Sequence, residues 1–472
     1  MKLERFKSIL LVLLVISSIV LTVNKWFNEK LWPEGYNFFS DVSSRFSFDT
    51  SSPVKFNPNE EVLKPAKIII NNTGNHVLYT KSSAEYQSLY ADIKNILIKA
   101  FNTDDYTETS IQEWNNNLKS KSCYFSYPVT YDYGFLLSQI TNKYQTSSGY
   151  CREFLISYDT RVSSALNLYI KDDRSEEIVK KRISYDTTSI SSLIEASSLS
   201  DEQNYYSFEL NFDMNSDDPV EQPVTIDSDV LISITEKNLP LIVEKNVFDD
   251  IIDNSSVYSQ ILSLFGINTS TIRRYVENDN SMVFVENYAT IKLKTNGLLD
   301  YKAVDTSMGI ELSGSNSYES INSCITFVNS VNDALFSGSE MYYEISSDIA
   351  DIKSRTYTLK FDYYIKDNMI STQRDVFDMD HSIIIEVVSG KIVSYKQVCK
   401  EYKSTTEVIS CPSAIDAIDS LSTSFYQFGE QVKDVFMAYT YNSIQNSWVP
   451  CWFIETSEGV ISMVPLMGGV AE

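Results

Sequence analysis

Histidine, the side chain most often used in acid–base catalysis, is almost missing from this chain. Only His76 and His381 occur among its 472 residues, and they lie far apart in the sequence. The HExxH, GxSxG and CxxC patterns of zinc hydrolases, serine hydrolases and thiol or zinc sites do not occur either. We therefore predict no catalytic residue, no cofactor and no metal ion. An enzyme is the weaker alternative, because only scattered carboxylates are left to carry its chemistry.

A second long hydrophobic run is also missing. The one run extends without a charge from Ser8 to Val23 and is flanked by Lys7 and Lys25. A spanning helix needs about 20 apolar residues. The two lysines can extend this run, because their ammonium groups reach the membrane interfaces while their stems stay in the apolar layer. We predict that residues 6–27 form a single transmembrane anchor.

No alanine precedes Ala66, so the usual small-residue cleavage site of a signal peptide is missing and the anchor is predicted to stay uncleaved. Lys2, Arg5 and Lys7 lie before the anchor, and basic flanks remain in the cytoplasm. Residues 1–5 are then a cytoplasmic stub, and the bulk of the chain is extracellular. The predicted location is the cell membrane, with one pass.

Basic residues are few compared with acidic ones. The chain has 39 Lys and Arg against 63 Asp and Glu, and a net charge of −24. Such a surface repels nucleic acid, so we predict no nucleic-acid partner. Hydrophobic residues reach 43%, with 31 Tyr and 24 Phe, which is ample for packed cores. The extracellular region should therefore be globular rather than a disordered stalk.

Six cysteines face the predicted oxidising side: Cys123, Cys151, Cys324, Cys399, Cys411 and Cys451. The sequence selects no connectivity among them. Cys399 and Cys411 flank a short link between two expected elements and could form a disulfide. The alternative is that most of the six are buried as small apolar side chains.

Two acidic stretches resemble metal sites only in part. Asp213, Asn215 and Asp217 have the spacing of a calcium loop, but Asp218 stands where such a loop needs glycine. Asp378 and Asp380, followed by His381, raise the same question. We interpret both stretches as acidic loops.

Apolar periodicity predicts an α+β fold. Behind the single N-terminal transmembrane helix we expect an extracellular, multi-domain region of antiparallel sheets, each packed on a helix. Ser82 and Glu85 form a capping-box pattern, which predicts a helix that runs to Phe101. In the C-terminal half an α-β-β-β unit repeats at residues 317–402 and 412–465, and a looser copy lies at 247–304.

Composition and periodicity also suggest domain limits. Residues 28–62 contain Pro33, Pro53 and Pro58 among polar residues and predict an extracellular tether. The predicted units that follow are an N-terminal region at 63–305, which a boundary near residue 235 could divide into two lobes, an αβ unit at 306–405 and a C-terminal αβ unit at 406–472.

Three segments carry a resemblance to a known family. They are the anchor sequence with Glu4 and Lys7 to Thr22, the opening Pro65–Tyr90, and the run Ile272–Tyr301. In these the chain resembles the YycH family, membrane-anchored regulators of the WalK sensor kinase in low-GC Gram-positive bacteria. Its C-terminal units, notably Trp448–Trp452 with Gly459, are similar to the αβ modules shared with the sister protein YycI.

The resemblance implies a non-enzymatic role. The expected partners are a YycI-like sister protein and a WalK-like sensor histidine kinase, and the expected effect is on cell-wall turnover. Contact is expected partly through transmembrane helices. Ser17, Ser18 and Thr22 would form the interaction face of the anchor, because small side chains allow helices to approach closely. The alternative is that these residues face lipid.

Other functions remain open on the residues alone. Trp448, Pro450 and Trp452 could line a carbohydrate-binding surface, as in a cell-wall-binding module, although a core position is the stronger interpretation. A module that inhibits a protease is another alternative. An anchored wall hydrolase is the enzymatic one.

Overall fold

The computed structural model describes residues 61–464, with gaps at 102–105, 142–148, 159–163, 173, 176, 186–190, 192–193, 196–202, 211–224, 250–254, 268–271, 337, 421–430 and 457–460. The predicted stub, anchor and tether lie outside the described residues. Within the described part, no helix is long and apolar enough to cross a membrane.

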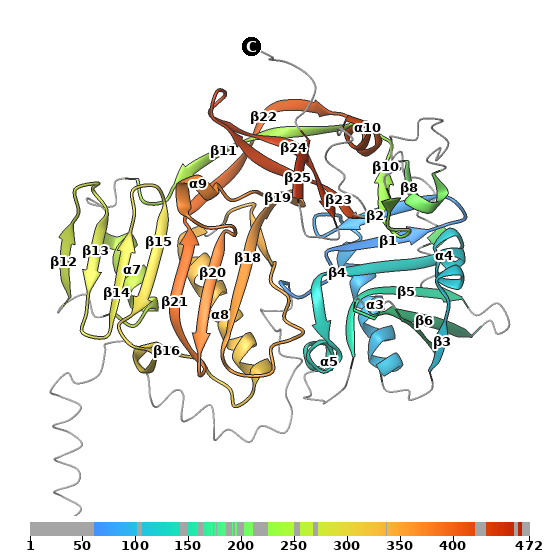
Figure 1. Cartoon of the computed structure of the whole chain (residues 1–472), viewed down its shortest axis with the longest axis horizontal. Coiled ribbons are helices and arrows are strands. Elements are labelled where there is room, and N and C mark those ends of the chain that lie inside the picture. The colour runs from blue at the N-terminus through green and yellow to red at the C-terminus, as the bar shows by residue number, and fades with distance from the viewer. Residues whose placement is uncertain are drawn as a thin grey trace, which may run out of the picture.

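The first sheet, which we call the N-terminal sheet, has seven strands in the order β2-β1-β4-β5-β6-β7-β3. All its strand pairs are antiparallel. The strands are β1 (Lys67–Asn71), β2 (His76–Thr80), β3 (Thr107–Thr109), β4 (Ser122–Asp132), β5 (Tyr150–Tyr158), β6 (Ala165–Lys171) and β7 (Ile178–Ser184). Figure 1 shows them on the right of the molecule.

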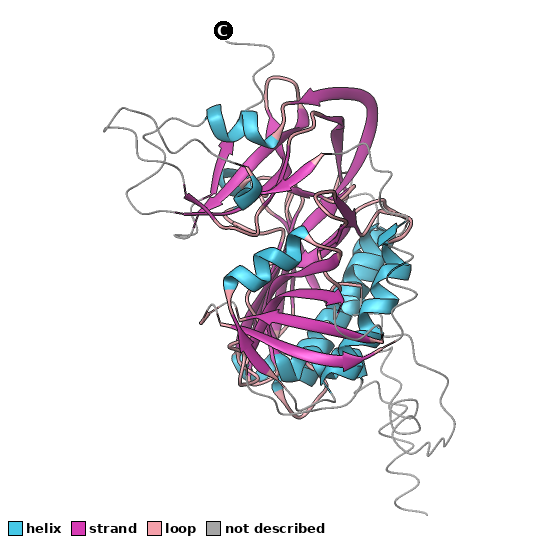
Figure 2. Cartoon of the chain, turned by 90° about the vertical axis from the view of Figure 1, so that its right-hand side faces the viewer, coloured by secondary structure: helices cyan, strands magenta, loops and turns pink. Residues whose placement is uncertain are grey.

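Helices cover both faces of the N-terminal sheet (Figure 2). α3 (Tyr86–Phe101) and α5 (Tyr133–Thr141) pack on the face that carries Ile68 and Phe125. α4 (Ile111–Lys119) packs on the opposite face together with Tyr206 of the short strand β8 (Asn204–Tyr206). A sheet that is apolar on both sides explains why β4 is buried along almost its full length.

The expected apolar stripe of α3 is confirmed. Its buried residues are Tyr86, Leu89, Tyr90, Ile93, Ile96, Leu97 and Ala100. The expected capping box is wrong, because the helix starts at Tyr86 and Ser82 donates its hydroxyl to Asp367, 285 residues further along the chain. Ser82, which the local pattern predicts to cap a helix, instead makes a contact between distant parts of the chain.

The second sheet, the C-terminal sheet, has 16 strands. Its main path runs β12-β13-β14-β15-β21-β20-β18-β19-β23-β24-β11-β22, and β16, β17, β25 and β9 join at its sides. The bounds are β9 (Thr225–Ile226), β11 (Lys237–Asn246), β12 (Arg273–Val276), β13 (Met282–Val285), β14 (Ala289–Leu293), β15 (Leu298–Ala303), β16 (Ile310–Glu311), β17 (Tyr342–Ile345), β18 (Tyr357–Ile365), β19 (Asn368–Ile370), β20 (Ile383–Val388), β21 (Lys391–Val398), β22 (Lys400–Cys411), β23 (Gln431–Asn442), β24 (Ser447–Thr456) and β25 (Ile461–Val464).

Two longer helices, α7 (Ser255–Leu264) and α8 (Ser317–Phe336), pack on one face of the C-terminal sheet. Two rings meet on Tyr395 of β21, with Phe265, directly after α7, at 5.3 Å and Phe327 of α8 at 5.6 Å between centroids. The shorter helices α9 (Arg374–Phe377) and α10 (Ala414–Ser420) lie further along the chain. The predicted helix at residues 317–336 is confirmed at both ends.

The α+β class with mostly antiparallel strands is confirmed, but the expected separate sheets are not. β15 pairs with β21 (Leu298 opposite Val398), so the sheet continues across the expected boundary at residues 305/306. The parallel pair β19–β23 joins the last αβ unit to the same sheet. The edge of each unit offers unpaired backbone groups, and pairing with the neighbouring unit satisfies them.

The possible Cys399–Cys411 disulfide does not form. Cys399 directly precedes β22 and Cys411 ends it, so an extended strand rather than a short link lies between them. At about 3.3 Å per residue the strand separates them by roughly 40 Å along its path, far beyond the span of a disulfide. None of the six cysteines, all of which lie in the described part of the chain, forms a disulfide, and all are buried. Burial raises the pKa of the Cys123 thiol to about 12 and that of Cys411 to about 11, so neither is a reactive thiolate at neutral pH.

Candidate functional interface between the two halves

The strongest candidate for a functional site is the surface where the two sheets meet. We call residues 61–233 the N-terminal half and residues 237–464 the C-terminal half. Polar and ionic contacts join the halves at several points, in contrast to the apolar interior of each sheet. Interfaces of this polar kind resemble those of domains that move relative to one another.

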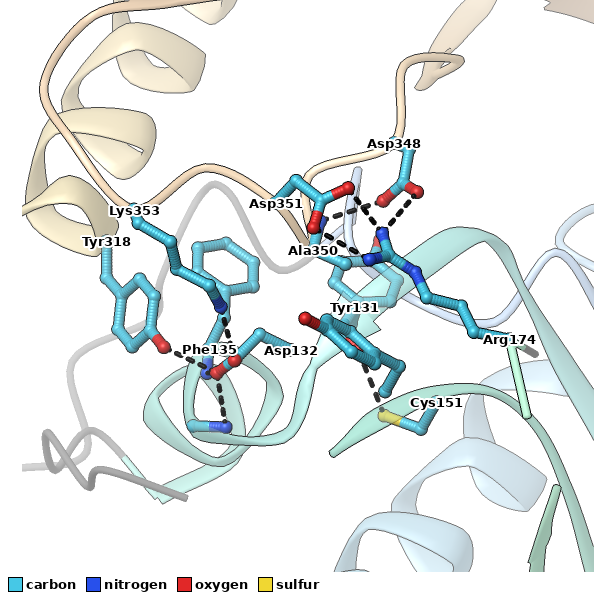
Figure 3. A network of polar contacts seen from close by, with 12 residues as sticks. Tyr131, Asp132, Phe135, Cys151, Arg174, Tyr318, Asp348, Ala350, Asp351 and Lys353 are labelled. Atoms are coloured by element: carbon cyan, nitrogen blue, oxygen red, sulfur yellow. Dashed lines mark hydrogen bonds and ion pairs between the residues drawn. The ribbon is translucent and has the colours of Figure 1, made fainter. Parts of the chain in front are cut away.

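Asp132 makes the first of these contacts (Figure 3). It ends β4 and caps α5, because its Oδ1 accepts hydrogen bonds from the backbone N–H of Gly134 at 2.9 Å and of Phe135 at 3.3 Å. The same carboxylate accepts a hydrogen bond from the Tyr318 hydroxyl of α8 and pairs with Lys353 at 2.8 Å. Asp132 therefore caps a helix of the N-terminal half and also binds two side chains of the C-terminal half.

Arg174 makes the second contact, from the loop between β6 and β7. Its guanidinium donates two hydrogen bonds to Asp351, at 2.7 and 2.6 Å, and one to Asp348 at 3.2 Å (Figure 3). Hydrogen bonding to Arg174 lowers the pKa of the Asp351 carboxyl. All three side chains are exposed, so this contact is open to screening by salt.

The third contact is the most buried. Lys81, just after β2, pairs with Glu344 of β17 at 2.6 Å, and their side chains are only 9% and 4% exposed. Beside them Asp367 accepts hydrogen bonds from the Thr80 hydroxyl at 2.6 Å and from the Ser82 backbone N–H at 3.1 Å. Asp367 occupies the turn between β18 and β19 with a φ of 63°. A strained turn residue is thus held by the other half.

Beyond these ion pairs, a ring contact and a short strand connect the halves. Phe135 and Tyr318 meet edge to face at 5.4 Å. β9 leaves the N-terminal half and pairs in parallel with β23. β10 (Leu231–Ser233), which pairs with β8 over the N-terminal sheet, shares a second apolar cluster with α10 and β24. The last unit therefore rests on the N-terminal half through the β8–β10 pair.

A buried charge cluster fixes the segment before β10. Lys171 of β6 lies 2.5 Å from Asp229 and 3.1 Å from Glu153 of β5. Burial and the adjacent Glu153 raise the pKa of Asp229 to about 7. Burial works against the charge of Glu153 as well, but Lys171 and Arg152 outweigh it and lower the pKa of Glu153 to about 2. Of the two carboxyl groups around this ammonium group, Asp229 is therefore the one that holds a proton up to near neutral pH.

Both histidines serve structural contacts. His76 lies 2.8 Å from Asn71 Oδ1 and 2.8 Å from Glu209, and burial lowers its pKa. His381 lies 2.8 Å from Asp362, and the Ser346 hydroxyl donates to the same carboxylate oxygen at 2.6 Å. Serine and imidazole thus meet at a carboxylate rather than at each other, so this group is not arranged as a nucleophile and its base.

The structure places the other candidate residues as follows. Asp378 ends α9 in the left-handed conformation, and Asp380 pairs with Lys360 at 3.4 Å. In the part of the chain that is described, no group of His, Cys, Asp or Glu could hold a metal ion. The acidic stretch at 213–218 and the anchor residues Ser17, Ser18 and Thr22 lie outside the described residues.

The tryptophans that could have bound carbohydrate are core residues. Trp448 and Trp452 are buried, with indole N–H groups that donate to Glu244 at 2.9 Å and to the backbone of Pro412 at 2.8 Å. Their rings are therefore not available as a flat sugar-binding surface. The core interpretation of Trp448 and Trp452 is confirmed.

The residues of the interface could not be predicted from the sequence. Lys81, Asp132, Arg174 and Glu344 are single charged residues in a strongly charged chain, and no spacing connects them. A weak signal exists only at Asp367, which follows Lys366 in a two-residue turn between strands. Both residues have a positive φ, which is uncommon for side chains other than glycine.

Fold and interface define a two-part α+β protein whose halves meet through ionic contacts. Residues 4–197 match the family model of the YycH protein N-terminal domain, which identifies this part of the chain as a YycH-family domain. The predicted family is therefore confirmed.

A solved structure shares this fold. The crystal structure of YycH from Bacillus subtilis matches with a TM-score of 0.56 at 11% identity, over 86% of this chain and 96% of that one. An uncharacterized protein from Eubacterium rectale ATCC 33656 matches at a TM-score of 0.29 and 9% identity, over 47% of this chain and 77% of that one. No curated protein matches the chain significantly.

Proposed function

We propose that this protein is a non-enzymatic, membrane-anchored extracellular regulator of a WalK-like sensor histidine kinase that controls cell-wall metabolism. It acts in a complex with the kinase and a YycI-like partner. The observation that carries the proposal is the YycH N-terminal domain match, which begins at residue 4 and so includes the sequence of the predicted anchor. The fold shared with the B. subtilis protein over most of both chains supports it.

The interface between the halves supplies a physical basis for regulation. A regulator needs an element with two arrangements whose balance a partner can shift. Ionic contacts such as Arg174–Asp351 are weak enough to open, while the buried Lys81–Glu344 pair fixes the register of closure. The N-terminal half directly follows the tether, so a force or contact on the anchor would reach this interface first.

Crosslinking in native membranes tests the proposal. The full-length protein is crosslinked, purified under denaturing conditions and analysed by mass spectrometry. We expect a sensor histidine kinase and a YycI-like protein among the captured partners. The matched control carries the same extracellular region on an unrelated spanning helix. A partner set without any histidine kinase would overturn the proposal.

The extracellular region, purified separately in its native form, can separate the alternatives. Turnover of wall fragments by the extracellular region would indicate an enzyme, and inhibition of one member of a protease panel would indicate an inhibitor module. We expect neither.

A further inference from the structure

β12 leaves one edge of the C-terminal sheet uncovered by any described strand. β12 is the outermost strand of the C-terminal sheet and pairs only with β13 among the described strands. Figure 1 shows it at the left end of the molecule. All four of its residues, Arg273–Val276, are exposed. Edge strands offer unpaired backbone N–H and C=O groups to any other extended segment.

The register shows which backbone groups face outward. Glu277 donates its N–H to Ser281, and this bond closes the hairpin between β12 and β13. Hydrogen-bonded and non-bonded pairs alternate along antiparallel strands. Tyr275 opposite Val283 is therefore bonded to β13, and the backbone groups of Arg274 and Val276 point to the free edge.

The side chains on this edge differ from those of a protected edge. Natural edges are usually blunted by lysine, proline or a bulge. β12 instead presents two arginines with Tyr275 and Val276, which are 51% and 48% exposed. Arginine and tyrosine are among the residues that contribute most to binding at protein interfaces. An edge of this composition favours association rather than protection.

Charge indicates what kind of segment would bind. Arg273 and Arg274 are the only adjacent arginine pair in a chain with a net charge of −24. Arg274 donates to the Tyr258 hydroxyl at 2.7 Å, and among the described residues neither guanidinium has a carboxylate partner. The nearby Glu277 is already paired with Lys292. The two arginines therefore leave a local positive charge without a counterion from the described chain.

We propose that the free edge of β12 binds an extended, acidic segment of a partner protein, which adds one strand to the C-terminal sheet. Backbone hydrogen bonds to Arg274 and Val276 hold the segment, and its carboxylates pair with the two arginines on either face of the sheet. The inference rests on the surface chemistry of β12 and does not depend on the identity of the kinase. Its failure would leave the crosslinking result interpretable.

The test uses the full-length protein in lipid nanodiscs and a labelled peptide with pairs of adjacent glutamates between valines, which places carboxylates on both faces of an added strand. Its binding is measured by fluorescence anisotropy, and a peptide with lysine in place of glutamate is the control. We expect saturable binding of the acidic peptide, about tenfold tighter than that of the basic one. Hydrogen exchange should slow at the amides of Arg274 and Val276, which lack a partner on β13, and not at Tyr275.

Two variants test the backbone contribution and the charge contribution separately. Val276→Pro removes an outward N–H without removing a bond to β13, and Arg273→Glu with Arg274→Glu reverses the charge. Each should weaken binding about tenfold, while Arg374→Glu, an exposed charge elsewhere, should leave it unchanged.

No saturable binding, or binding of the acidic peptide by either variant as tight as by the wild type, would overturn the proposal. A concentration-dependent dimer that Val276→Pro abolishes would also overturn it, because a second copy would then occupy the edge.

Discussion

Lys81 and Glu344 form a buried ion pair between the two halves of the molecule, with Nζ and Oε1 2.6 Å apart. The ammonium group also lies 5.7 Å from the centre of the Tyr342 ring. Lys81 follows the edge strand β2 of one sheet, and Glu344 lies on β17, which joins the other sheet at its side. One charge pair thus connects two sheets that share no strand.

Removal of one member of this pair should destabilise the protein strongly. Lys81→Ala leaves the Glu344 carboxylate buried without a partner, which costs about 3–5 kcal/mol. The double variant Lys81→Met with Glu344→Leu removes both charges and should recover most of this loss. Urea unfolding of the fragment 29–472, which lacks the predicted anchor, measures both values. An equal loss in the single and double variants would show that packing, not charge, holds this point.

Arg174→Ala should have a much smaller effect. The contacts of Arg174 with Asp348 and Asp351 are exposed, and pairs of this kind contribute about 1 kcal/mol or less. The effect should shrink further between 50 mM and 1 M salt, whereas that of Lys81→Ala should persist. Unfolding curves at both salt concentrations test the contrast, and a large, salt-independent loss for Arg174→Ala would contradict it.

Asp229 predicts a pH dependence of stability. Burial and Glu153 raise its pKa to about 7 in the folded protein from 3.8, so the folded state binds an extra proton between these values. This contribution to stability is present at low pH and is lost as the pH rises from about 4 to about 7. Asp229→Asn mimics the protonated form, so it should raise the melting temperature at pH 8 relative to wild type. It should also reduce the loss of stability that accompanies the rise in pH. An unchanged pH profile would exclude Asp229 as its source.

Ile325→Asp should unfold the unit around α8. Ile325 has no exposed surface and lies among Ile321, Val328 and Val331 on the face toward the sheet. An unpaired carboxylate there costs several kcal/mol, roughly 4 or more. Circular dichroism melting of the fragment 29–472 measures it, with Thr326→Asp on the exposed side of the same helix as the matched control. Equal melting curves for the two variants would contradict the assigned helix face.

The elements with strong local patterns could be predicted from the sequence, and those fixed by long-range pairing could not. The stripe of α3 and the limits of α8 follow from a helical period of apolar residues. β11 was not predicted, since Pro240 and several polar residues interrupt any alternation along it. Its position depends on β22, 156 residues away at Glu244 and Lys400.

The interface residues could not be predicted for a related reason. Asp367 and Ser82 are local signals for a turn and a helix cap, and only the meeting of the two halves gives them a shared role. The family resemblance was accessible because it depends on contiguous segments of sequence, such as the one at residues 65–90. Ion pairs between distant residues leave no such trace in one sequence.

The anchor carries a prediction about association. Lipid tails provide no hydrophobic drive between helices, so contact depends on close packing at small residues. Ser18→Leu with Thr22→Leu should therefore weaken co-purification of the kinase while membrane insertion and folding stay intact. Leu10→Ile, a conservative change in the same segment, is the matched control. Undiminished co-purification by the double variant would move the interaction to the extracellular region.

The most direct measurement of the regulatory role is the autophosphorylation rate of the WalK-like kinase in lipid nanodiscs, with and without the full-length protein and the YycI-like partner. The account predicts that the rate changes by about fivefold or more when the wild-type protein is present, and less when its anchor is replaced by an unrelated spanning helix. A rate that stays the same at saturating amounts of the wild-type protein would contradict the account.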